Sequence, residues 1–304
     1  MERMEKDFDK KLEIKRLLIY LFFAFGLTWP VFFLSYFEGI KWDGANQDMQ
    51  TFIGLGMIMP FVANFITRAI TKEGFAMTGD DSLMLGICFK NKKWIYYLFA
   101  ILIPWIYYEA SYLFEILIVP NAFDPLYYQV LGVKKEIVFF FPLIAISSSV
   151  LLSIGALGEE GGWRGYMMPK LIRLIGLPKA IIVGGIIWGL WHAPLTCCGH
   201  NFGTEYAGFP YLGILFMCVL CTLIGIMLTF VTVKTQSIWP ATFMHAINNA
   251  TPCILKFFVN EEAVKEYFNG NTLTIWMFLL IPYVIIDAVI ILISLKKRKT
   301  NREK

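Results

Sequence analysis

The chain has 304 residues, of which 57% are hydrophobic and 16% are charged, and its formal net charge is +4. An average soluble domain has about 25% charged residues, so this composition excludes an ordinary water-soluble globule and is typical of a protein whose solvent is largely lipid. The basic residues lie at the ends of apolar stretches and not in a patch interleaved with aromatic residues, so we expect no nucleic-acid partner.

Apolar stretches long enough to cross a bilayer recur along the chain. A helix needs about 20 residues to cross about 30 Å of hydrocarbon. Eight stretches qualify, at residues 17–37, 51–67, 94–119, 137–157, 179–199, 211–233, 237–257 and 272–295. The sequence therefore predicts an all-α polytopic membrane protein with eight transmembrane helices in the lipid bilayer.

The 27 basic residues predict the orientation of these spans. Twenty-two of them lie in the two terminal segments and the alternate loops that share their side, and five lie in the other connections. The positive-inside rule then places both termini in the cytoplasm of a cell-membrane protein. We expect a cytoplasmic basic segment (1–16), a single transmembrane domain (17–295) and a cytoplasmic basic tail (296–304). Residues 163–176 mix basic and apolar side chains and predict a short interfacial helix after the fourth span.

Ionisable residues within the predicted spans mark candidate functional positions. Each costs about 2.5–3.5 kcal/mol on insertion scales, so we expect it to have a specific role. The set comprises Glu109, Glu115, Glu159, Glu160, Arg164, His192, His245 and Asp287.

Two adjacent carboxylates close the fourth span. Arg164 stands four residues after Glu160, the favourable order for an i,i+4 ion pair on a helix. This pairing would leave Glu159 on a neighbouring face, where it could act as a base or a ligand. The alternative is a charged helix end at the membrane interface.

Two histidines lie in separate later spans. His245 has Asn249 one turn later on the same face, whereas Asn248 points about 100° away. His192 could equally be a histidine bonded to a neighbouring helix. Two histidines, a carboxylate from a third helix and an amide are groups that suit hydrolysis of an acyl bond. The third histidine, His200, is expected to lie outside this set.

The pattern resembles the CPBP family of intramembrane proteases. That family contains CAAX prenyl endopeptidases, bacteriocin-processing and immunity proteins, and abortive-infection proteins. The resemblance rests on Glu-Glu-x-x-x-Arg, an aromatic residue ahead of a histidine, and His-x-x-x-Asn, between residues 159 and 249, with the flanking segments GWRGY, WGLWHAP and HAINNA. Trp188 stands where the family often has Phe. The eight-helix fold of the family agrees with the span count.

The resemblance implies an intramembrane endopeptidase that hydrolyses a peptide bond of a membrane-anchored or amphipathic protein or peptide, through CAAX-type or leader processing. Glu159 and His192 would activate the attacking water, and His245 and Asn249 would stabilise the oxyanion. The supporting residues would be Glu160, Arg164 and Trp188.

The role of a metal stays open at this point. Glu159, His192 and His245 could be three protein ligands of a catalytic zinc with an open fourth position. Without a metal, Glu159 paired with His192 could act as the general base. The local zinc-protease signature HExxH is absent from the sequence, and no organic cofactor is expected.

Two other functions are compatible with the membrane fold. A non-catalytic immunity or scaffold protein could use it to bind a peptide, and a transporter could relay protons through Glu109, Glu115 and Asp287. The complete hydrolytic set favours the protease, because a pure binding protein has no need of water-activating residues.

Overall fold

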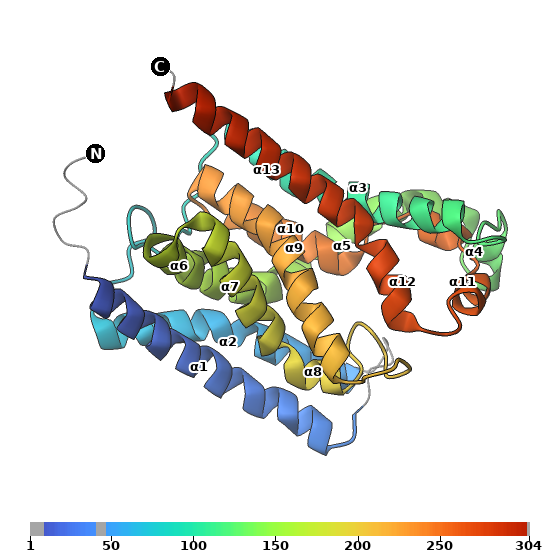
Figure 1. Cartoon of the computed structure of the whole chain (residues 1–304), viewed down its shortest axis with the longest axis horizontal. Coiled ribbons are helices and arrows are strands. Elements are labelled where there is room, and N and C mark those ends of the chain that lie inside the picture. The colour runs from blue at the N-terminus through green and yellow to red at the C-terminus, as the bar shows by residue number, and fades with distance from the viewer. Residues whose placement is uncertain (1–8, 41–46, 303–304) are drawn as a thin grey trace.

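The computed structural model describes residues 9–40 and 47–302, and within them the chain is all-α, without a β-strand. This confirms the predicted fold class. The start of α1 (Lys10–Phe37) and the end of α13 (Ile281–Arg302) lie at the same end of the helix bundle (Figure 1). The other α-helices are α2 (Gln47–Thr71), α3 (Trp94–Ile118), α4 (Tyr127–Val130), α5 (Lys135–Gly162), α6 (Met168–Ile175), α7 (Leu177–Trp191), α8 (Ala193–Cys197), α9 (Tyr211–Thr235), α10 (Trp239–Ala250), α11 (Glu261–Tyr267) and α12 (Thr272–Leu279). A π-helical turn, η1 (Trp163–Met167), and a 3-10 turn, η2 (Leu255–Phe258), complete the set.

Six helical segments of the described chain are long and apolar enough to cross a membrane, and the predicted spans 179–199 and 237–257 are shorter helices. The first of these, α7, has 15 residues and ends before His192, and Pro194 lies in the first turn of the next helix. The second, α10, has 12 residues and ends at Thr251, whose φ of +48° breaks the helix. Both fall short of the roughly 20 residues of a full crossing, so the count of eight stays a prediction.

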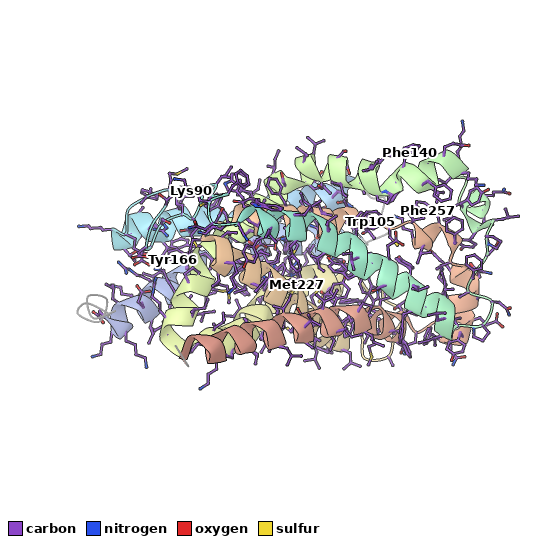
Figure 2. The ribbon with its side chains drawn as sticks, turned by 90° about the horizontal axis from the view of Figure 1, so that it is seen from above. Lys90, Trp105, Phe140, Tyr166, Met227 and Phe257 are labelled. Atoms are coloured by element: carbon purple, nitrogen blue, oxygen red, sulfur yellow. The ribbon has the colours of Figure 1, made fainter. Side chains whose placement is uncertain are left out.

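The fourth span does not end at residue 157 as predicted. It continues to Gly162, passes through the π turn η1 and runs on as α6. The predicted interfacial helix 163–176 is thus helical, but all of η1 is buried and continues the span. Tyr166 of this turn lies toward the same end of the molecule as Lys90 (Figure 2). Such π turns within α-helices are frequent at functional sites.

The terminal helices extend into the predicted basic segments. The first helix begins at Lys10, before its predicted start, because the Asp9 carboxylate caps it with hydrogen bonds of 2.9 and 3.1 Å to two backbone amides. The last helix likewise runs into the predicted tail 296–304. Residues 1–8 and 303–304 of these segments lie outside the described residues.

Glycine contacts bring the helices of the candidate site close together. A Cβ on Gly158 of α5 would lie 2.5 Å from the carbonyl oxygen of Met57 in α2. One on Gly189 of α7 would lie 2.4 Å from the Cα of Cys218 in α9. Because both neighbours are backbone atoms, a larger residue would push the helices apart. These contacts fix α5 and α7 against α2 and α9.

Candidate active site

Glu160 joins two other predicted site residues. Its Oε1 accepts a hydrogen bond of 3.1 Å from Arg164 Nη1 and one of 2.8 Å from His245 Nδ1. All three side chains are buried, and Glu160 is 0% exposed. The predicted i,i+4 pair of Glu160 and Arg164 is therefore present. The same carboxylate orients the His245 ring on α10 and leaves its Nε2 for another partner.

Glu159 is held by two tryptophans. Its Oε2 accepts hydrogen bonds from the indole nitrogens of Trp188 at 2.6 Å and Trp163 at 3.3 Å, and the residue is 2% exposed. Trp188 has the supporting role predicted for it, as a hydrogen-bond donor to Glu159, whereas no role was predicted for Trp163. The available signal was its position, because Trp163 follows Glu159 by four residues on the same helical face.

His192 lies at the sharp connection between α7 and α8. Its Nδ1 donates a hydrogen bond of 2.9 Å to the backbone carbonyl oxygen of Trp188. We assign the hydrogen to Nδ1 because this partner is an acceptor only, so Nε2 carries the lone pair. A neutral imidazole with an available Nε2 can act as a base.

Trp188 lies at the centre of the site. Its ring centroid is 5.9 Å from that of His192 and 5.5 Å from that of His245. The guanidinium of Arg164 lies over its face, with Cζ 4.3 Å from the ring centroid. The indole also donates its hydrogen bond to Glu159. Trp188 therefore contacts Glu159 of α5, Arg164 of η1, His245 of α10 and His192, which follows α7.

His200 lies closer to the site than expected. Its ring is nearly parallel to that of His192, with an angle of 10° between the planes and 6.3 Å between the centroids. The expectation that His200 takes no part in the hydrolytic set stays a prediction. No sequence spacing revealed the parallel rings, because a short helix and a turn separate the two histidines.

The two asparagines at the end of α10 differ in their surroundings. Asn249, the predicted oxyanion ligand, is exposed, and its Oδ1 accepts a hydrogen bond of 3.2 Å from Asn248 Nδ2. Asn248 is anchored to α3, since its Oδ1 accepts from the Tyr107 hydroxyl and its backbone oxygen accepts from the Tyr108 hydroxyl at 3.0 Å. Asn248 is therefore packed against α3, whereas the hydrogen bond of the Asn249 side chain described above lies within α10; the oxyanion role of Asn249 stays a prediction.

The three predicted zinc ligands do not converge on one point. Among the described residues, no group of three His, Cys, Asp or Glu side chains is placed to hold a metal ion. The hydrogen bonds of both Nδ1 atoms and of Glu159 Oε2 leave the two Nε2 atoms and Glu159 Oε1 for another partner. A role for zinc stays a prediction.

Of the remaining acidic residues, Glu109 has a structural role as a hydrogen-bond acceptor for backbone amides. Its Oε1 accepts from the backbone amide of Ile254 at 2.8 Å, and its Oε2 from that of Leu255 at 3.1 Å, which caps η2. Glu115 and Asp287 are buried, and both Asp287 oxygens lack a hydrogen-bond partner among the described residues. The cap on η2 accounts for the carboxylate of Glu109 without a transport function.

Replacing Glu109 by Ala is expected to lower stability by about 1–3 kcal/mol, because two partly buried backbone amides lose their acceptor. Thermal unfolding in detergent measures the loss, with Glu136→Ala on the exposed start of α5 as the control. Peptide cleavage by the folded variant should stay within about twofold of wild type, since the residue binds backbone rather than the site. A cleavage defect without a stability defect would contradict this role.

Comparison with known proteins agrees with the motif. Residues 140–251 match the family described as Type II CAAX prenyl endopeptidase Rce1-like. This range contains the motif residues from Glu159 to Asn249. A curated protein of Methanococcus maripaludis named CAAX prenyl protease 2 is 26% identical over 244 residues, which cover 78% of this chain and 86% of that protein.

Proposed function

The chain belongs to the CPBP/CAAX protease family of membrane proteins, and from this premise we propose that it is an intramembrane endopeptidase that uses water activated by Glu159 and His192. The observation that carries the proposal is that Glu159, His192 and His245 gather around Trp188. Glu160 joins them through its hydrogen bond with His245. Groups of this kind supply both a base and a partner for developing negative charge.

In the proposed reaction, Glu159 takes a proton from water while the water oxygen attacks the peptide carbonyl carbon. His192 orients the water through Nε2. With both nitrogens protonated, His245 donates one hydrogen to Glu160 and the other to the oxyanion, beside Asn249. Glu159 then returns its proton to the departing amine nitrogen, and the C–N bond breaks. The products are a carboxylic acid and an amine, and the acid then gives its proton to the amine to form a carboxylate and an ammonium group.

We propose a membrane-anchored substrate with a prenylated C-terminal segment, because the curated relative is named a CAAX prenyl protease. The test is reconstitution in liposomes with three peptides: a farnesylated CAAX peptide, the same peptide without the lipid, and an amphipathic leader peptide. Cleavage of the first by wild type and not by Glu159→Gln is the expected result. Preferential cleavage of the leader peptide would overturn the substrate assignment, and binding without cleavage of any peptide would support a scaffold.

We also propose that both ends of the chain face the cytoplasm of the cell membrane. Twenty-two of the 27 basic residues fall on the side of the termini by sequence. The start of α1 and the end of α13 lie at one end of the molecule (Figure 1), as this topology requires. The positive-inside rule assigns that end to the cytoplasm.

A further inference from the structure

Arg68, near the end of α2, is a buried cation at the centre of a hydrogen-bond network. It is 2% exposed, and its Nε donates to Asn64 Oδ1 at 2.7 Å. Its two terminal nitrogens donate to the backbone oxygens of Gly74 at 3.2 Å, Asp81 at 2.5 Å and Ser82 at 2.7 Å. The planar guanidinium thus fastens both ends of the loop 74–82 to α2, which a single ammonium group could not do.

Asn64 extends this network to the candidate site. Its side chain is fully buried, and its Nδ2 donates a hydrogen bond of 2.8 Å to the backbone oxygen of Gly161, the residue after Glu160. Arg68 also lies 5.3 Å from the ring centroid of Tyr166 in η1. The pair therefore contacts the backbone that carries Glu160 and the turn that carries Arg164.

The loop fastened by Arg68 continues to the start of α10. The backbone oxygen of Met84 accepts a hydrogen bond of 3.0 Å from the amide of Ile238, and that of Leu85 accepts one of 2.8 Å from the Trp239 indole. The helix that begins there carries His245 less than two turns later. The hydrogen bonds of Asn64 and Arg68 thus connect to the backbone of α5 next to Glu160 and, through the loop, to the start of the helix that carries His245.

We propose that Asn64 and Arg68 are positioning residues that set α10 against the end of α5 and so hold Glu160 and His245 at 2.8 Å. The inference rests on the proposed function for its catalytic consequence. Neither residue touches the substrate, because both act through Gly161 and the loop 74–85. Displacing a catalytic group by about 1 Å can lower the rate about 100-fold.

Asn64→Asp separates this role from a general loss of stability. Aspartate keeps the acceptor for Arg68 but replaces the donor to the Gly161 oxygen with a second oxygen. We expect kcat to fall about 100-fold with KM within about twofold. The matched control is Thr67→Val, which removes a buried hydrogen bond of 2.7 Å from the Thr67 hydroxyl to the Ala63 backbone oxygen, a bond that lies within α2. An unchanged kcat in Asn64→Asp, or an equal loss in Thr67→Val, would overturn the proposal.

A second measurement does not depend on activity. In Arg68→Lys, hydrogen exchange at the Ile238 amide is expected to become at least about tenfold faster, because the loop that supplies its acceptor is released. The same amide should stay protected in Thr67→Val. Unchanged protection in Arg68→Lys would overturn the coupling even if cleavage is found. Absence of cleavage by wild type would contradict the proposed function alone, since the exchange result still decides the coupling.

Discussion

Replacing Glu159 by Gln is expected to lower kcat about 10³-fold, within the range that a general base contributes. Glutamine has the same shape, and its amide oxygen can still accept from the indoles of Trp188 and Trp163, so packing is retained. What is lost is an oxygen able to take a proton from water. Steady-state cleavage of the peptide identified in liposomes measures the effect, and thermal unfolding should change little.

The matched control is Glu136→Gln, the same substitution at an exposed position in the first turn of the same helix. It should leave kcat within about twofold of wild type. If Glu159→Gln keeps more than a tenth of the activity, Glu159 is not the base and His192 must fill that role alone. If cells that carry Glu159→Gln or His192→Gln keep the phenotype of cells that carry the wild-type protein, the non-catalytic alternative replaces the protease.

The ion pair of the site could be predicted from sequence because it is local. Glu160 and Arg164 are four residues apart on one helix, and helix geometry alone brings them together. The contact of Glu160 with His245 spans 85 residues, so no spacing rule could give it. Only the family resemblance placed these residues in one site, and it did so without distances.

The errors in the predicted spans have a common physical cause. Apolar composition continues past His192 and past Ala250, so a hydropathy count lengthens both helices. The backbone ends them earlier, at a connection followed by Pro194 and at the left-handed Thr251. Conversely, the charged residues after residue 157 suggested a helix end, whereas buried partners for Glu159 and Glu160 allow the helix to continue. Composition does not reveal such partners.

The ion pair between Glu160 and Arg164 allows stability and catalysis to be separated. Arg164→Met leaves the buried Glu160 carboxylate with His245 as its partner, and Glu160→Gln leaves the guanidinium without its carboxylate. Glu160→Gln is expected to lose about 3–5 kcal/mol of stability, because the buried guanidinium is left without its carboxylate. Arg164→Met should lose less, because the protonated His245 ring still faces Glu160. Thermal and denaturant unfolding in detergent measure these losses.

The double variant Glu160→Gln with Arg164→Met should recover most of that stability, since replacing both partners of a buried pair is often close to neutral. Activity should not recover with it, because a neutral amide no longer fixes the protonated His245 ring through a charge-assisted bond. Additive losses in the double variant would show that the two charges are stabilised independently. Recovery of both stability and kcat would mean that Glu160 serves packing alone, and His245 would then need another group to orient it.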